Sequence, residues 1–225
     1  MKLQKETAAH GRWYNDACGT AFAMEIVGER WTLLIVRELM FGPLRFSDIR
    51  TQLPGLSAKV LTERLERLEG AGVLAQRKLP PPAGVQVYEL TDWGRAAEPV
   101  IIALGRWAAH SPLHDPSLPL SPVSFMLSLR TMFDPAKAGG WTGRMGFRLP
   151  AISFVAEVTN GILSARRAEP EECLAVLAAR DGAALAAYIY GDAPPRELDV
   201  RITGDGAAAA RFASFFELPR PITPA

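Results

Sequence analysis

Apolar residues recur at helical spacing through the first half of the chain. In ERWTLLIVRELMFG they follow the i, i+3, i+4, i+8 pattern of a buried helical face, formed by Trp31, Leu34, Ile35 and Leu39. A second stripe, in LSAKVLTERLERLEGAGVL, is formed by Leu61, Leu65 and Leu68. Ser57 can cap this second helix and Gly72 can end it. Both segments are therefore predicted to be amphipathic helices.

The neighbouring segments add shorter elements. Asp16 can cap a helix that runs to about Val27, and RFSDIRTQL predicts a short helix before the leucine stripe. VLAQRKL and VQVYELT are predicted to be short strands joined by PPPAG. Thr91 can cap a last helix, DWGRAAEPVIIALGRWAAH, in which Pro99 predicts a kink. Three short helices followed by a two-stranded ribbon predict a winged helix-turn-helix.

The polar face of the leucine-striped helix is the first candidate functional surface. In a winged helix-turn-helix, the third helix packs by its apolar stripe and leaves the other face free to enter a major groove. Basic side chains there can meet phosphates or guanine edges, hydroxyls can bond to either, and Glu63 can accept from cytosine. Together with the preceding helix and the ribbon, the candidate DNA contacts are Arg45, Ser47, Ser57, Lys59, Thr62, Glu63, Arg64, Arg67, Arg77 and Lys78. The alternative is a face that is merely solvated.

The second half of the chain follows a different pattern. The run WAAHSPLHDPSLPLSPVS predicts a linker, because so many prolines cannot continue a helix or a central strand. Beyond it, Asn160-Gly161 predicts a hairpin, Pro170 opens a predicted helix that Asp181-Gly182 ends, and LDVRITGD alternates as a strand. We therefore expect an α+β chain of two domains. The expected boundaries are a winged helix-turn-helix over 1–110, a linker over 111–123, and an α+β layer with a mainly antiparallel sheet over 124–225.

Composition narrows the function classes. The chain has 225 residues, 48% of them hydrophobic, and a formal net charge of +1, so any basic footprint must be local. Two cysteines without a Cys-x-x-Cys pair indicate a reducing cytoplasm. No apolar run reaches the length of a membrane span, and the N-terminus lacks the apolar core of a secretion signal. His10, His110 and His114 are scattered and no catalytic motif occurs, so we expect no metal, no cofactor and no enzymatic activity.

Residues 17–109 resemble a known family of regulators. The matching pieces, in order, are the Trp31 helix, Gly42 with Arg45-Phe46-Ser47, Pro54-Gly55-Leu56-Ser57, the Leu61 to Gly72 run, and Tyr88-Glu89-Leu90-Thr91 before Gly94. Together they look like the HxlR-type subgroup of the MarR-like transcription regulators. The resemblance implies a bacterial, cytoplasmic regulator that binds double-stranded DNA as a homodimer and lies at the nucleoid when bound.

The same resemblance implies which helices join the two protomers. In that family the first and last helices of the domain build the dimer, which here means the helices Asp16 to Val27 and Asp92 to Ala108. The second of these has an apolar stripe formed by Ala97, Ile101, Leu104 and Ala108. The alternative for this stripe is burial within one subunit.

Cys18 is a candidate redox site. The family often has a cysteine near this point, usually followed by proline, and some members use it to sense oxidants or electrophiles; here Gly19 follows. A helix N-terminus favours the thiolate, whereas the nearby Asp16 opposes it. The alternative is a small, buried, inert cysteine. A disulfide of Cys18 would have to be intermolecular or reach Cys173.

Residues 122–219 resemble a sterol carrier protein type two-like domain. The matching pieces are the Asn160-Gly161 hairpin, the Glu169 to Leu177 helix start, the Leu198 to Asp205 strand and the Phe212 to Pro219 ending. The resemblance implies an apolar cavity for a hydrophobic small-molecule effector, with a candidate lining of Phe125, Met126, Leu129, Met132, Phe133, Phe212 and Phe216. The alternative is that these residues fill a solid core. A second function class therefore stays open, a hydrophobic-ligand carrier or protein-interaction module that no longer reads DNA.

Overall fold

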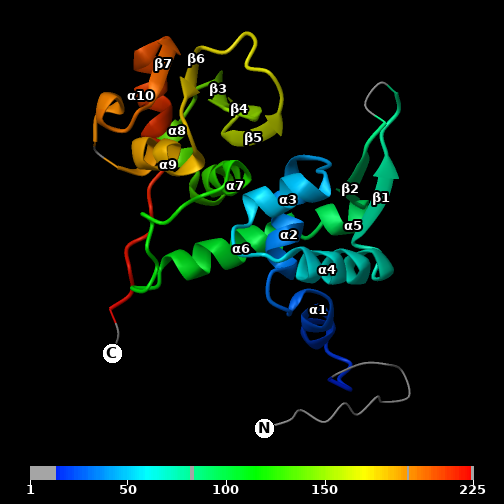
Figure 1. Cartoon of the computed structure of the whole chain (residues 1–225). Helices are drawn as coiled ribbons and strands as arrows, with labels where there is room; N and C mark the ends of the chain where they lie inside the picture. The colour runs from blue at the N-terminus through cyan, green and yellow to red at the C-terminus, as the bar shows by residue number, and fades with distance from the viewer. Residues whose placement is uncertain (1–13, 82–83, 192, 224–225) are drawn as a thin grey trace. The chain divides into compact units, whose positions relative to one another are not determined.

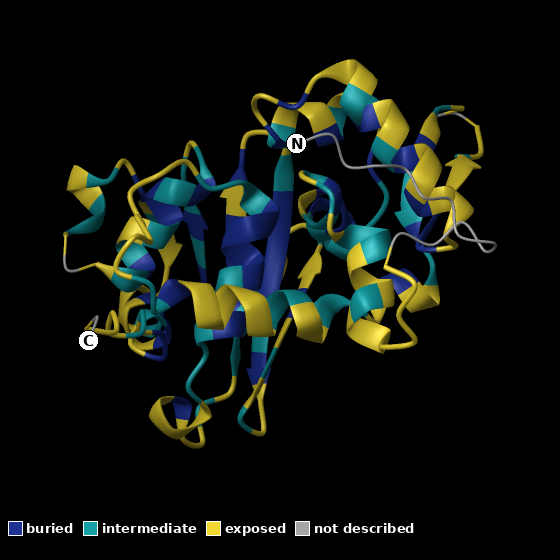
Figure 2. Cartoon of the chain, turned by 90° about the horizontal axis from the view of Figure 1, so that it is seen from below, coloured by how far each residue is buried: buried dark blue, intermediate teal, exposed yellow. Residues whose placement is uncertain are grey.

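The chain folds into two separate units. A computed structural model describes residues 14–81, 84–191 and 193–223, shown by sequence position in Figure 1 and by burial in Figure 2. Contacts divide the chain into Met1–Ala97 and Glu98–Ala225, so the division lies earlier than the boundary expected near residue 110. Among the described residues, every helix is too short or too polar to reach across a lipid bilayer.

The first unit has the element order of a winged helix-turn-helix (Figure 1). Its elements are α1 (Gly19–Val27), α2 (Thr32–Glu38), a 3-10 turn η1 (Leu39–Phe41), α3 (Phe46–Gln52), α4 (Ala58–Gly70), the strands β1 (Leu74–Lys78) and β2 (Gln86–Leu90), and α5 (Asp92–Arg95). β1 and β2 pair antiparallel, as the strand-like runs predicted.

α4 begins and ends where the sequence predicts. The Ser57 hydroxyl accepts a hydrogen bond from the amide of Val60 at 3.3 Å, which caps the helix. The predicted stripe of Leu61, Leu65 and Leu68 is buried. At the other end Gly72 has φ +76°, and its amide and that of Val73 bond back to the last turn of the helix. This closure turns the chain directly into β1.

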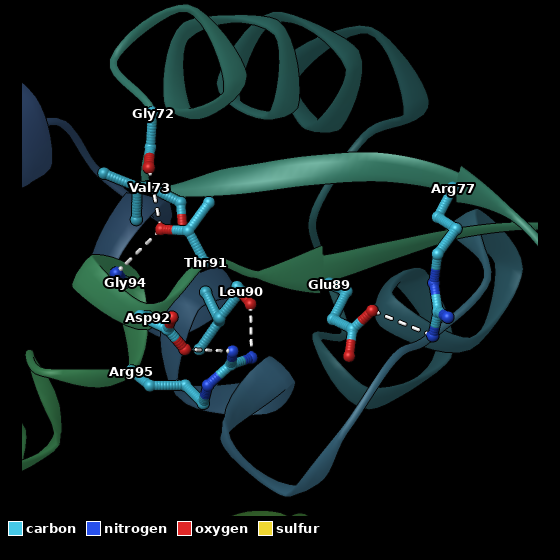
Figure 3. A network of polar contacts seen from close by, with 9 residues as sticks. All are labelled: Gly72, Val73, Arg77, Glu89, Leu90, Thr91, Asp92, Gly94 and Arg95. Carbon is cyan, nitrogen blue, oxygen red and sulfur yellow. Dashed lines mark hydrogen bonds and ion pairs between the residues drawn. The ribbon is translucent and has the colours of Figure 1, made fainter.

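A second tight junction follows the ribbon, where β2 meets α5 (Figure 3). The Thr91 hydroxyl donates to the Gly72 carbonyl at 2.8 Å and accepts from the Gly94 amide at 3.0 Å. A Cβ on Gly94 would lie 2.0 Å from the Val73 carbonyl oxygen, so only glycine fits. Thr91 and Gly94 therefore belong to the same junction, at which the ribbon packs against α5.

Three local predictions in this region need correction. Asp16 does not cap α1, because its carboxylate accepts from the Cys18 amide at 2.9 Å and the N-cap position is Cys18. Leu34 is 38% exposed, because the short α2 turns Ile35 and Val36 inward instead. The single helix expected from Asp92 is two helices, α5 and α6 (Glu98–Ala109). Proline suits the first turn of a helix, where its missing amide is not needed. Pro99 accordingly lies in the first turn of α6 and does not kink a longer helix.

The second unit is a five-stranded mixed sheet with helices. Its elements are α6, α7 (Pro122–Met132), α8 (Pro135–Ala138), β3 (Gly143–Leu149), β4 (Ile152–Thr159), β5 (Ile162–Arg167), β6 (Ala175–Ala178), α9 (Gly182–Tyr190), a 3-10 turn η2 (Pro195–Glu197), β7 (Arg201–Gly204) and α10 (Gly206–Ala213). The strand order is β5-β4-β3-β6-β7, and only the β3–β6 pair is parallel. The sheet, expected to be mainly antiparallel, is mixed, with antiparallel pairs in the majority.

The β4–β5 hairpin confirms the Asn160-Gly161 prediction, since both residues have positive φ, +53° and +72°. The helix predicted to start at Pro170 is wrong. The chain there makes a turn and then inserts β6 between β3 and β7, where Ala175 and Leu177 are buried. Asp181 starts a helix and does not end one, because its carboxylate accepts from the Ala184 amide at 2.8 Å.

Aromatic rings from helices and strands fill the core of the second unit. Phe125 of α7 contacts Phe147 of β3, with ring centroids 5.4 Å apart, and Phe147 lies 6.1 Å from Phe212 of α10. Phe212 in turn lies 4.9 Å from Phe216. Buried positions gather on the central strands of the sheet (Figure 2). These contacts join α7, the sheet and α10 into one core.

Candidate nucleic-acid interface

α4 presents a polar face opposite its buried leucines. Lys59, Thr62 and Glu63 are exposed on this side, and Glu66, which the sequence analysis did not single out, lies with them. The Thr62 hydroxyl donates to the Ala58 carbonyl at 3.1 Å within its own helix. Lys59 forms no ion pair within the described part of the chain. Lys59, in the N-terminal half of α4, is therefore a cation with no ion-pair partner among the described residues, and it lies beside exposed polar side chains.

Arg64 and Arg67 have a different environment from Lys59. Both guanidinium groups pair with the Glu29 carboxylate, at the junction between α1 and α2. Arg64 Nε also donates to the Arg30 carbonyl at 3.3 Å. The Arg64 side chain is only 17% exposed. These two of the predicted DNA contacts thus lie against the protein.

α3 and the residue before it carry another set of exposed polar groups. Arg45 lies exposed at the N-cap position, and its backbone amide donates to the Asp48 carboxylate at 3.1 Å. Ser47 is exposed one turn before Arg50, which is exposed as well. The sequence analysis missed Arg50, although its spacing of three residues from Ser47 places both on one helical face.

The ribbon supplies one paired and one unpaired cation. Arg77 of β1 forms an ion pair with Glu89 of β2, with 2.9 Å between nitrogen and oxygen (Figure 3). Lys78 is exposed and has no ion-pair partner among residues 14–81, 84–191 and 193–223. Pro82 and Ala83, in the PPPAG loop that joins the two strands, lie outside the described residues.

The two cysteines have opposite environments. Cys18 is fully exposed at the start of α1, and hydrogen bonds from the Ala21 and Thr20 amides lower the pKa of its thiol. Burial raises the pKa of the Cys173 thiol, against the opposing charges of Arg144 and Arg166. The alternative of a buried Cys18 therefore does not hold. In the described residues, no group of three His, Cys, Asp or Glu side chains could hold a metal ion.

Two helices expose apolar surface. α1 buries none of its residues and exposes Phe22 and Met24. α6 packs on α7, held by an ion pair between Glu98 and Arg130, and buries only Ala109. Of the predicted stripe of Ala97, Ile101, Leu104 and Ala108, the last two are exposed on α6, Ile101 is half-buried, and Ala97 directly precedes the helix. Val100 and Trp107 lie exposed beside Leu104 and widen this face.

The residues predicted to line a ligand pocket divide into two groups. Phe125, Met126, Leu129, Phe212 and Phe216 are buried and belong to the aromatic core described above. Met132 and Phe133 are half-buried and line a hollow of about 360 Å³ on the surface of the second unit. The other residues around this hollow are Arg106, His110, Thr131, Asp134, Pro135, Lys137, Glu217 and Pro219.

Comparison with known proteins identifies the N-terminal part of the chain, from within α1 to just beyond α6. The HxlR-like helix-turn-helix family model matches residues 26–114. YvaP of Bacillus subtilis, an uncharacterised HTH-type transcriptional regulator, is 44% identical over 87 residues, which cover 38% of this chain and 80% of YvaP. The B. subtilis HTH-type transcriptional regulator YodB is 37% identical over 86 residues, covering 38% of this chain and 77% of YodB.

A solved structure of the reduced form of YodB aligns with this chain at a TM-score of 0.40 and 33% identity, over 44% of this chain and 100% of the YodB chain. The family conclusion depends on the sequence matches, which span most of each relative. The chain therefore belongs to the HxlR-like helix-turn-helix family of transcriptional regulators, and it is a DNA-binding regulator of transcription.

Proposed function

We propose that the protein binds its operator as a homodimer, with α4 of each protomer in one of two successive major grooves. The observation that carries the proposal is the exposed face of α4 around Lys59, Thr62 and Glu63, opposite the buried leucines. Two such helices must lie about 34–36 Å apart to meet two half-sites of B-form DNA. The protein would act in the bacterial cytoplasm, at the nucleoid.

Each candidate side chain then has a role that follows from its chemistry. Ser57, Lys59, Thr62 and Glu63 lie in the first turns of α4, the part of such a helix that reaches base edges. We assign a second group of exposed side chains to phosphates, which fix register without reading sequence: Arg45, Ser47, Arg50, Arg77 and Lys78. Arg77 would have to leave its partner Glu89 to do so.

The homodimer is supported by the exposed apolar faces of α1 and α6. Large side chains on both are exposed in one chain: Phe22, Met24, Val100, Leu104 and Trp107. An exposed apolar face of this kind marks a protein interaction surface. A second copy of the chain is the partner that supplies the two recognition helices that a palindromic operator requires.

The test is a titration of the DNA upstream of its own gene at several salt concentrations. Lys59→Ala should reduce the slope of log affinity against log salt by about one, because a phosphate-neutralising lysine releases about one counterion. Arg196→Ala, which removes an exposed cation from the second unit, is the matched control and should leave the slope unchanged. Binding that is insensitive to Lys59→Ala would contradict this docking.

A second proposal concerns response to a small molecule. The hollow beside Met132 and Phe133 combines apolar walls with Arg106, His110 and Lys137. Its volume of about 360 Å³ falls in the range of small-molecule sites. We propose it as the effector site of the sterol carrier-like second domain, since the buried aromatic core is filled by its own rings. Ligand binding without any DNA binding would favour the carrier function instead.

Cys18 supports a third proposal, a response to oxidants or electrophiles. Its exposure and its lowered pKa both favour the reactive thiolate. Cys18→Ser should leave DNA binding under reducing conditions intact and abolish any loss of binding under mild peroxide or quinone. A wild-type protein whose DNA binding ignores both reagents would rule this out.

A further inference from the structure

The junction between α1 and α2 combines an unusual backbone conformation with a buried, unsatisfied polar group. Trp31, the residue before α2, has φ +78°, a left-handed conformation that a bulky side chain rarely adopts. The adjacent Thr32 hydroxyl is buried and has no hydrogen-bond partner within the described part of the chain. Such strained positions persist only where the surrounding contacts over-determine them, and they cluster at functional elements.

The contacts around this junction come from α4 and from the turn that precedes it. The Trp31 ring lies against Gly55 in the turn that enters α4, 3.8 Å from the position of a Cβ there. The Arg30 guanidinium lies over the Trp31 ring, 5.1 Å from its centroid. The Arg30 carbonyl accepts from Arg64, halfway along α4. The junction therefore contacts α4 at its entrance and at its middle.

Glu29 supplies the charged part of this contact. One carboxylate oxygen pairs with Arg64 and the other with Arg67. All three side chains are partly shielded from solvent, with exposed fractions of 21% for Glu29, 17% for Arg64 and 42% for Arg67. A carboxylate divided between two guanidinium groups one helical turn apart restrains rotation of α4 about its own axis.

We propose that Glu29 is a specificity-determining positioning residue, which fixes the rotation of α4 and withholds Arg64 and Arg67 from the DNA backbone. The inference depends on the proposed docking of α4. Arginines released from Glu29 would add phosphate contacts that are independent of sequence. They would strengthen binding to any DNA, while a less restrained α4 would read bases less well, so the ratio of specific to non-specific affinity would fall.

The first experiment compares Glu29→Gln with Glu25→Gln, on operator DNA and on unrelated DNA of the same length. Glu25→Gln removes the same charge from α1, and among the described residues the Glu25 carboxylate accepts from the Tyr14 amide and forms no ion pair. Glu29→Gln should tighten non-specific binding, steepen its salt slope by about one to two, and lower the specificity ratio about tenfold, the size of one mismatched base pair. Equal effects of the two variants on both DNAs would overturn the proposal.

A double-mutant cycle gives the second measurement. In the wild type, Arg67→Gln should leave the salt slope unchanged, because Glu29 holds this arginine. In the Glu29→Gln background, Arg67→Gln should reduce the slope by about one, because the arginine then meets a phosphate. A reduction already present in the wild type would mean that Arg67 contacts DNA despite Glu29, which overturns the proposal.

Lys59→Ala in the same titrations separates this inference from the docking of α4. If Lys59→Ala changes the slope while Glu29→Gln behaves like Glu25→Gln, the docking stands and the role of Glu29 is wrong. If Lys59→Ala has no effect, the docking itself is wrong and the role of Glu29 falls with it. Circular dichroism of each variant at the assay temperature verifies that α4 is folded.

Discussion

Gly94 lies where the ribbon closes onto α5, and its missing side chain is a packing requirement. A methyl group there would lie 2.0 Å from the Val73 carbonyl oxygen, in the junction that Thr91 holds together. We expect Gly94→Ala to lower the free energy of unfolding by about 1–3 kcal/mol, as overpacked sites do. Gly70→Ala is the control, since nothing lies within 4 Å of its added carbon. Urea denaturation measures both, and equal stabilities would contradict the packing argument.

The reactivity of the two cysteines should depend on pH in different ways. A thiolate reacts with iodoacetamide and a thiol does not, so the rate rises with pH until the pKa is passed. Helix amides lower the pKa of Cys18, and burial raises that of Cys173. The alkylation rate of Cys18 should therefore level off at a pH below the ordinary pKa of a thiol. That of Cys173 should level off at a pH above it.

Mass spectrometry of peptides alkylated over a pH series gives both profiles in one experiment. Cys18→Ser and Cys173→Ser proteins assign each rate to its residue. Coincident profiles for the two cysteines would show that the start of α1 does not favour the thiolate.

Residue-level predictions from sequence hold where the chemistry is local. Ser57 and Gly72 bound α4 as expected, because a cap and a left-handed glycine act on the adjacent helix turn. The pairing of Arg64 and Arg67 with Glu29 could not be read in the same way. It joins residues more than thirty positions apart, and a helical pattern shows which face is polar without showing what that face meets.

At the scale of elements, the failed helix at Pro170 shows the same limit. Acidic residues after a proline are typical of a helix start, and the sequence there supplied them. The small apolar run Ala175–Ala178 is instead the strand that bridges β3 and β7. A four-residue strand between two partners is stabilised by their backbone hydrogen bonds, so its own propensity decides little.

The exposed face of α6 makes the prediction that belongs to this scale. Leu104 lies at the centre of the apolar stripe, on the side of α6 away from the buried Ala109. Leu104→Ser should convert the dimer to a monomer at micromolar concentration, because it places a hydroxyl inside an apolar interface. Leu113→Ser changes a leucine outside α6 that is more exposed than Leu104, and it should leave the dimer intact. Sedimentation velocity decides, and a Leu104→Ser dimer of unchanged strength would contradict this assignment.

For the whole molecule, the division between Ala97 and Glu98 gives α6 a particular position in the sequence. α6 follows the winged helix-turn-helix directly, yet its own contacts are with α7 in the second unit. A helix that forms the proposed dimer interface therefore belongs to the unit that carries the hollow. Sequence could not predict this, because the Pro-rich run after Trp107 marks a change of composition and the contacts of α6 extend beyond it.

A small molecule in this hollow would contact Arg106 of α6 and His110, which directly follows the helix. Such a ligand can change the affinity for DNA only if it binds the DNA-bound protein and the DNA-free protein with different affinities. The coupling must also be reciprocal, so that DNA changes the affinity for the ligand by the same factor. We therefore expect the amphipathic probe 1-anilinonaphthalene-8-sulfonate to bind the protein and to weaken operator binding. Operator DNA should in turn weaken binding of the probe by the same factor, about 5- to 150-fold for typical coupling.

The control for this linkage is a variant in which the hollow is filled. Met132 is half-buried on its wall, so Met132→Trp should occupy the space and abolish both probe binding and its effect on DNA. Leu113→Trp adds the same ring at an exposed site and should bind the probe like the wild type. Fluorescence titrations with and without operator DNA measure both constants. Undiminished probe binding by Met132→Trp would place the ligand elsewhere, and unequal factors in the two directions would mean that probe and DNA are not linked through one equilibrium.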